Sequence, residues 1–183
     1  MPRLILLNGP PGIGKSTLAS RFADDHPGTL NLDIDHVRML VGGWCEDFVG
    51  AGEIVRPLVL HMAATHLEGG RDVVVPQYLA TNDEVEAFSS VATGSSAAFV
   101  EVLLIDSRAA SIERFNRRGG EADRLRRVVG TVVADAGGDV HLGDLYDDLL
   151  TDVAARTPVE IVSESGDIDG TYRTLCAVLA SAR

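Results

Sequence analysis

The sequence predicts an α/β fold in which helices cover both faces of a parallel sheet of five strands. Short apolar runs alternate with helical patterns along the chain, and this order produces strand–helix–strand units. The run Asp72–Val75 is apolar after its first residue, as in a strand buried on both faces. With 183 residues, 45% of them hydrophobic, the chain suits one domain with a sizeable core. We therefore expect a single domain over residues 1–183.

Glycine and proline punctuate the expected elements. In the first half these are a strand at Arg3–Leu7, a helix at Lys15–Asp25, a strand at Thr29–Leu32, a helix at Glu53–Leu67 and a strand at Asp72–Val75. In the second half they are a helix at Asp83–Ala92, a strand at Phe99–Ile105, helices at Ser107–Arg118, Ala122–Ala136 and Leu142–Arg156, a strand at Val159–Val162 and a helix at Ile168–Ala182.

Composition narrows the possible partners. The formal net charge is -11, so the chain has no overall field to hold a polyanion, and nucleic acid is a disfavoured partner. No apolar run approaches the roughly 20 residues of a membrane span, and a cytoplasmic location is the default expectation. Cys45 and Cys176 lie far apart in the sequence, which favours two free thiols in a reducing compartment.

A complete phosphate-binding loop follows the first strand and opens the first helix. It consists of Gly9, Pro10, Pro11, Gly12, Ile13, Gly14, Lys15 and Ser16, and it matches G-x-x-x-x-G-K-[ST] in the required strand–helix context. Glycines let the loop amides approach phosphate oxygens. Lys15 is the only lysine and should reach the β- and γ-phosphates, Ser16 should ligate Mg²⁺, and Thr17 should touch a phosphate. The expected ligands are ATP and Mg²⁺.

A pair of aspartates follows the second strand. In a parallel sheet the carboxyl ends of the strands form the ligand crevice, so Asp33 and Asp35 should face the phosphate loop, on one side of an extended segment. Asp35 can accept the proton of an attacking hydroxyl, and Arg38 can supply a cation. The alternative is that Asp35 is a helix N-cap; His36 is expected at the surface.

The densest basic patch of this acidic chain lies near its middle. Arg114, Arg117 and Arg118 have i, i+3, i+4 spacing and should share a helical face; Arg124, Arg126 and Arg127 follow two glycines. Such arginines suit a lid over about residues 114–127 that neutralises charge on a transferring phosphate, with Arg118 and Arg114 as the leading candidates. The alternative is a solvated face paired with neighbouring carboxylates.

The chain contains the phosphate loop, then the Asp-x-Asp-x-x-Arg segment, and then the arginine-rich lid. In this order of motifs it resembles P-loop kinases of the chloramphenicol phosphotransferase, zeta-toxin and polynucleotide-kinase group. The resemblance implies a three-layer, nucleoside-kinase-like P-loop NTPase fold with sheet order 2-3-1-4-5 and a helical lid. It also implies transfer of the ATP γ-phosphoryl to a hydroxyl, with Asp35 as general base, Arg38 binding substrate or phosphate, and Ser163–Asp169 near adenine.

One position departs from that group. Its third strand often ends in an aspartate, whereas this chain has Gln77, which cannot bring a charge to Mg²⁺. Either Asp33 takes the electrostatic role or Gln77 contacts substrate. Pro76 indicates an unusual turn at the strand end.

The acceptor should bind to residues of about 41–68 and to the turn after Gln77. Trp44, Cys45, Phe48, Arg56 and Tyr78 could form a partly apolar pocket with one cation; equally, Trp44 and Phe48 could pack a helical flap. The leading function is a kinase for a hydroxyl of a small molecule: an antibiotic, sugar, nucleoside or nucleotide-sugar. A regulatory nucleotide-binding ATPase and a polynucleotide 5′-hydroxyl kinase are the alternatives. The sequence does not indicate the oligomeric state or the choice between ATP and GTP.

Overall fold

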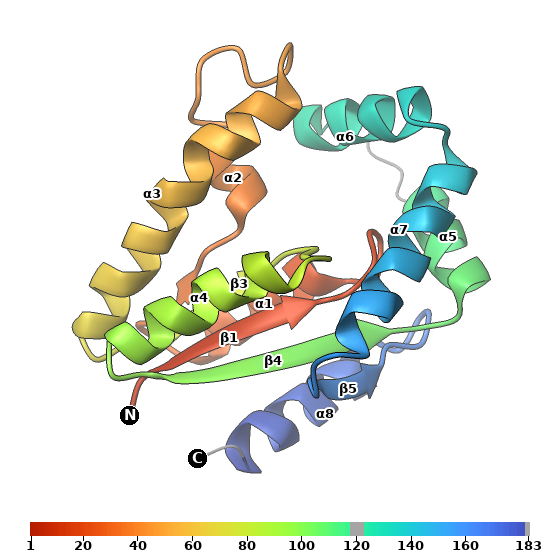
Figure 1. The fold of residues 1–183 in the computed structure, drawn as a ribbon. Coiled ribbons are helices and arrows are strands. Elements are labelled where there is room, and N and C mark those ends of the chain that lie inside the picture. Colours follow the sequence, from red (N-terminus) through yellow and green to blue (C-terminus); the bar gives the residue numbers. More distant parts are fainter. Residues whose placement is uncertain (118–122, 182–183) are drawn as a thin grey trace.

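A computed structural model describes residues 1–117 and 123–181 of the chain. Its five strands are all parallel and form one sheet in the order β2-β3-β1-β4-β5, which confirms the predicted fold class and strand order (Figure 1). The strands are β1 (Arg3–Asn8), β2 (Leu30–Asn31), β3 (Val73–Pro76), β4 (Ala98–Ile105) and β5 (Val159–Val162).

The described helices lie between these strands, except the last, which follows β5. They are α1 (Lys15–Asp25), α2 (Ile34–Arg38), α3 (Phe48–Glu68), α4 (Asn82–Gly94), α5 (Arg108–Arg117), α6 (Arg124–Asp135), α7 (Asp139–Val153) and α8 (Ile168–Ser181). Helix α3 begins at Phe48 rather than at the expected Glu53. The Asp47 side chain caps it by accepting from the Gly50 amide at 2.9 Å, and this cap offsets the low helix propensity of the two glycines in the first turns.

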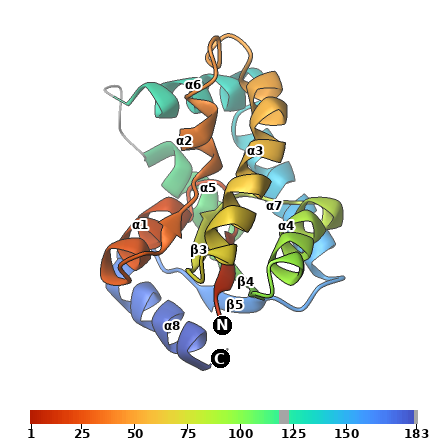
Figure 2. The ribbon, with the colours of Figure 1, turned by 90° about the vertical axis from the view of Figure 1, so that its left-hand side faces the viewer.

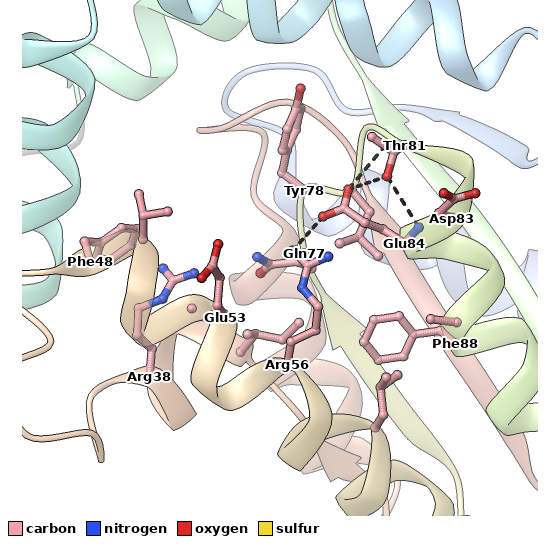
Figure 3. Close-up of a pocket in the computed structure, with 16 residues that line it drawn as sticks. Arg38, Phe48, Glu53, Arg56, Gln77, Tyr78, Thr81, Asp83, Glu84 and Phe88 are labelled. Atoms are coloured by element: carbon pink, nitrogen blue, oxygen red, sulfur yellow. Dashed lines mark hydrogen bonds and ion pairs between the residues drawn. The ribbon is translucent and has the colours of Figure 1, made fainter.

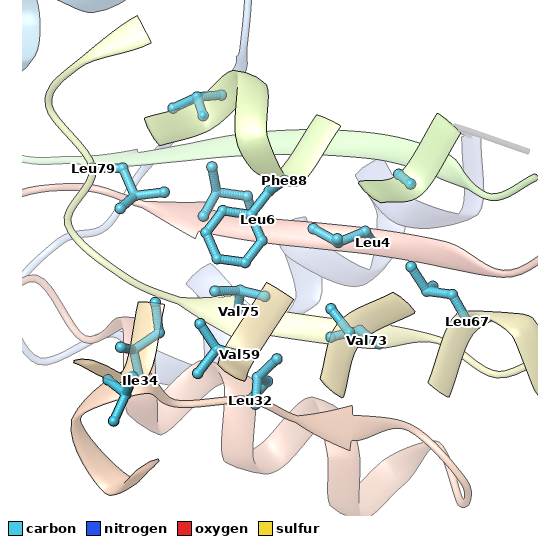
Figure 4. Packing of buried hydrophobic residues seen from close by; sticks show 14 residues of the cluster. Leu4, Leu6, Leu32, Ile34, Val59, Leu67, Val73, Val75, Leu79 and Phe88 are labelled. Atoms are coloured by element: carbon cyan, nitrogen blue, oxygen red, sulfur yellow. The ribbon is translucent and has the colours of Figure 1, made fainter. Parts of the chain in front are cut away.

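Alternating side chains of β1 divide the core between the two faces of the sheet. Leu4 and Leu6 point into a cluster with α3 and α4, which includes Val59 and Phe88 (Figure 4). Ile5 and Leu7 belong to the opposite cluster, with residues of α1 and α8. Figure 2 shows the resulting three layers, with α1 and α8 on one side of the sheet and α3 and α4 on the other. This alternation is the period-2 pattern of a strand covered on both faces.

Proline at the end of a central strand is tolerated here because β2 is short. Pro76 pairs with Leu7 of β1, whereas β2 pairs with β3 only as far as Val74. The next amide, that of Gln77, donates to the Leu7 carbonyl at 3.1 Å, so the chain continues along β1 rather than turning sharply. The missing amide of Pro76 therefore removes no bond from the ladder.

Helix α6 lies across the carboxyl end of the sheet, from the start of α3 to the pair α5 and α7 (Figure 1). It touches the segment before α3, because the Arg124 guanidinium lies 5.3 Å from the centre of the Trp44 ring. Among the described residues, no helix is long and apolar enough to cross a membrane.

Candidate active site

The phosphate loop connects β1 to α1, and two of its glycines cannot be replaced without rearrangement. Gly9 and Gly12 have φ angles of 147° and 97°. A Cβ atom on Gly9 would lie 2.4 Å from the Leu104 carbonyl oxygen, and one on Gly12 would lie 2.8 Å from the Phe115 amide nitrogen. The loop is thus packed against the end of β4 and against α5, and glycine is required by both conformation and space.

The polar groups of the loop are arranged around an open helix terminus. The N-cap of α1 is Gly14, and no side chain caps the amide groups at this end of the helix. Anion-binding helix termini have the same arrangement. Lys15 is buried, and its Nζ donates to the Gly9 and Pro10 carbonyls at 2.7 and 3.0 Å. Ser16 and Thr17 are exposed in the first turn.

These residues fit a nucleotide with Mg²⁺. The Ser16 hydroxyl is an exposed oxygen ligand beside the phosphate cradle, and no described cluster of three or more His, Cys, Asp or Glu residues could hold a metal on its own. Mg²⁺ typically keeps several waters and binds through few protein oxygens together with substrate phosphates. Ser16 would therefore hold the ion jointly with those phosphates.

Arg114 contacts the backbone of the phosphate loop and of the segment after β5. Its guanidinium donates to the Ile13 carbonyl at 2.6 Å and to the Ser163 carbonyl, and only 15% of the side chain is exposed. Arg117, by contrast, is exposed and pairs with Glu113 at 2.5 Å. Arg114 and Arg117 therefore have different partners, and the pairing of Arg117 with Glu113 is the one that the solvated-face alternative expects. Arg118 lies outside the described residues.

Asn8 joins the phosphate loop to the loop after β3, a role that the sequence reading missed. Its Oδ1 accepts from the Gly9 and Leu79 amides at 2.8 and 3.1 Å, and its Nδ2 donates to the Leu79 carbonyl at 2.9 Å. The Nδ2 also donates to Glu101 at 3.2 Å, and the side chain is fully buried. A polar residue ending an otherwise apolar strand was the available signal, because buried amides need partners.

The segment with the two aspartates, which follows β2, forms a short helix rather than an extended strand. Asp33 is the N-cap of α2 and accepts from the Asp35 amide at 3.0 Å. The N-cap of α2 is therefore Asp33, not Asp35. One turn later, Arg38 donates to Asp35 Oδ1 at 2.6 Å and stacks on the Phe48 ring at 3.8 Å.

The surroundings of Asp35 shift the pKa of its carboxyl group. Burial raises its pKa above the ordinary aspartate value, the charge of Arg38 lowers it, the neighbouring charge of Asp33 raises it, and the charge of Lys15 lowers it more weakly. Lys15 of the phosphate loop is thus among the charges that act on Asp35. A carboxylate near a phosphate site with a raised pKa is a candidate general base.

A cavity of about 640 Å³ opens beside Arg38 (Figure 3). Of the predicted acceptor-binding residues, Arg38, Arg56, Gln77 and Tyr78 line it. Trp44 does not: it is 6% exposed and packs beneath Arg124. In this respect the structure agrees with the flap alternative for Trp44, whereas Phe48 of α3 lines the cavity.

Two cavity residues are occupied by other contacts. The Tyr78 hydroxyl donates to the Leu145 carbonyl of α7 at 3.0 Å, and burial raises its pKa to about 12, so it stays a neutral donor. Arg56 pairs with Glu84 at 2.8 Å. Glu84 also completes the capping box of α4 with Thr81; this carboxylate was not among the predicted site residues.

Fold and loop together define the class of this chain: a three-layer P-loop NTPase fold with a nucleoside-kinase-like sheet order. The chain belongs to the AAA domain family AAA_33, whose family model matches residues 4–136. A search of curated proteins finds no match.

Solved structures with a similar fold include two kinases and a resistance protein. A gluconokinase from Sinorhizobium meliloti superposes with a TM-score of 0.67 at 17% identity, over 98% of this chain and 93% of that chain. A shikimate kinase from Bacteroides thetaiotaomicron gives 0.63 at 19% identity, covering 98% of both chains. A tunicamycin resistance protein from Deinococcus radiodurans gives 0.58 at 18% identity, over 98% of this chain and 96% of that chain. At these identities the likeness shows the fold alone.

Proposed function

We propose that this protein is a phosphotransferase that moves the γ-phosphoryl of Mg·ATP to a hydroxyl of a small molecule. The observation that carries the proposal is the ion pair between Asp35 and Arg38, because Arg38 lines a cavity large enough for a small acceptor, and the charge of Lys15 in the phosphate loop also acts on Asp35. A regulatory ATPase needs no such acceptor cavity. The fold shared with a gluconokinase and a shikimate kinase supports the same conclusion.

The proposed chemistry divides the work between backbone and side chains. Bound Mg·ATP supplies the phosphoryl group and neutralises part of its charge. The loop amides and Lys15 hold the phosphates and stabilise charge that develops on them during transfer. One carboxylate oxygen of Asp35 is fixed by Arg38, and its other oxygen accepts the proton of the attacking hydroxyl.

Arg114 and the lid have separate tasks in this proposal. Arg114 keeps the Ile13 carbonyl and Ser163 in place, and thereby holds the phosphate loop in shape. Arg118, which lies outside the described residues, and the arginines of α6 are the candidates for neutralising charge on the transferring phosphate.

An ATP-consumption screen tests the proposal. Hydroxyl compounds, including gluconate, shikimate, nucleosides and antibiotics, are added one at a time with Mg·ATP, and product is identified by mass. We expect one class to raise ATP consumption well above the basal rate and to yield a phosphorylated product, with Lys15→Ala abolishing both. Hydrolysis that no small hydroxyl compound changes, but that a protein partner alters, would instead support the regulatory ATPase.

A further inference from the structure

Five charged side chains face the acceptor cavity, and their balance is acidic. The guanidiniums are Arg38 and Arg56, and the carboxylates are Glu53, Asp83 and Glu84. Figure 3 shows Glu53 on α3 between Arg38 and Gln77. Side-chain recognition of a carboxylate or phosphate on the acceptor uses a cation that is free to pair with it.

Arg38 forms an ion pair with Asp35. Their ion pair measures 2.6 Å, and only 12% of the Arg38 side chain is exposed. The ring of Phe48 covers the guanidinium at 3.8 Å, and a Cβ on Gly52 would lie 2.8 Å from its terminal nitrogen. Only Nη1 bonds Asp35, and Nε is buried without a hydrogen-bond partner among the described residues. An anionic acceptor would therefore have to displace the covering Phe48 ring or break a largely buried pair, and both are unfavourable.

Arg56 is committed to Glu84. The pair measures 2.8 Å, and Glu84 is itself held by Thr81 at the start of α4. Arg56 is more exposed than Arg38, but an acceptor anion would still have to compete with a carboxylate that the helix cap fixes in place.

Glu53 and Asp83 remain, and neither has an ion-pair partner within 4.0 Å among the described residues. An anionic acceptor would therefore meet uncompensated like charge. The remaining lining is mainly apolar, with Ile34, Phe48, Val49, Leu60, Leu79 and Phe88. Such a surface suits a ring or chain without ionic groups.

Resting on the phosphotransferase function, we propose that the acceptor is an uncharged or cationic hydroxyl compound with an apolar body. Carboxylate- and phosphate-bearing acceptors are excluded, and Glu53 is a specificity-determining residue. Gln77 offers a neutral amide to such a compound, which gives this departure from an aspartate a role in binding.

Matched pairs of acceptors test the inference. Shikimate is compared with its methyl ester, gluconate with glucitol, and uridine 5′-monophosphate with uridine, by kcat/KM from ATP consumption. We expect the uncharged member to be preferred by about tenfold or more wherever a pair is used, because like charges placed side by side disfavour the anionic member. Glu53→Gln should reduce this preference and Glu53→Arg should reverse it, whereas Glu68→Gln, at the exposed end of the same helix, should leave it unchanged.

The outcomes separate the two proposals. A preference for the anionic member, or a preference that Glu53→Arg does not move, overturns the acceptor class while the kinase function stands. If neither these pairs nor the wider screen yields a phosphorylated product, the phosphotransferase function fails and the acceptor class falls with it.

Discussion

The two halves of the candidate active site are built in different ways. The proposed nucleotide half is one continuous stretch, Gly9–Thr17, whose candidate ligand groups are mainly backbone amides and whose Gly9 and Gly12 are required by contacts with β4 and α5. The acceptor half gathers side chains from α2, α3, α4 and the loop after β3. A site built from one continuous stretch of backbone can be recognised from a sequence motif. A site built from side chains far apart in the sequence depends on how the helices and strands pack.

Asn8 is where the two halves meet. Its side-chain amide binds the amide that opens the phosphate loop and both backbone groups of Leu79 in the acceptor half. Variants on either side of Asn8 should therefore damage one half and spare the other, and a change at Asn8 should affect both.

The largest effect is expected at Asp35, on the acceptor side. Asp35→Asn removes the base and should lower kcat by about 10²–10⁴-fold, while ATP affinity stays close to wild type because the phosphate loop is untouched. Steady-state kinetics and nucleotide titration measure the two quantities. Turnover that survives this change would show that the carboxylate is not the base.

Lys15→Ala should damage the nucleotide half, with a loss of about 10²–10³-fold in kcat. Because Lys15 is the only lysine, an amine-specific reagent can modify only this side chain and the chain's terminal amine. Modification should inactivate the protein, and ATP should protect against it. Inactivation without ATP protection would contradict the placement of Lys15 at the phosphates.

Asn8→Ala should weaken both halves at once. It leaves the Gly9 amide and the Leu79 backbone groups without their side-chain partner in a buried place, which costs about 1–3 kcal/mol per unsatisfied group. We expect a lower midpoint of thermal unfolding and raised KM values for ATP and acceptor together. The matched control is Asn116→Ala, whose exposed hydrogen bond to Asp139 should matter less; a change in only one KM would refute the joint role.

The pH profile should report on Asp35. Proton acceptance requires the ionised carboxylate, and burial raises its pKa, so kcat/KM should fall as pH falls through a value above that of ordinary aspartate. Arg38→Gln removes the cation that lowers this pKa, and the acid limb should move to higher pH. Arg56→Gln should leave the limb in place, since Arg56 is not among the charges acting on Asp35.

The smallest effect is expected where α6 meets the acceptor segment. Arg124→Gln removes the contact with Trp44 and should lower stability by about 0.5–1 kcal/mol. Trp44 is the only tryptophan, so its emission should shift to longer wavelength as the ring becomes more exposed. Arg173→Gln, exposed on α8, is the control; the same shift in that variant would show that the emission does not report on α6.

Predictions from the sequence were most accurate for elements whose conformation is set by their own residues rather than by distant contacts. The strands, most helix limits and the phosphate loop follow from apolar periodicity, glycine positions and one lysine. It was least successful at α2 and α5. Asp33 and Asp35 were placed in an extended segment because a helix of five residues leaves no periodic signal, and Arg114 was assigned to the lid because spacing along a helix does not say what that helix faces.

The sequence by itself determined the α/β class and the phosphate loop of this protein, because strand periodicity and a glycine-rich turn are local properties of the chain. Only the tertiary structure decided that Arg38 holds Asp35, that Arg114 supports the loop through Ile13, and that Asn8 binds Leu79 across 71 positions. Those pairings depend on which buried polar groups come within hydrogen-bonding distance when the layers pack, and no spacing in the sequence encodes that distance.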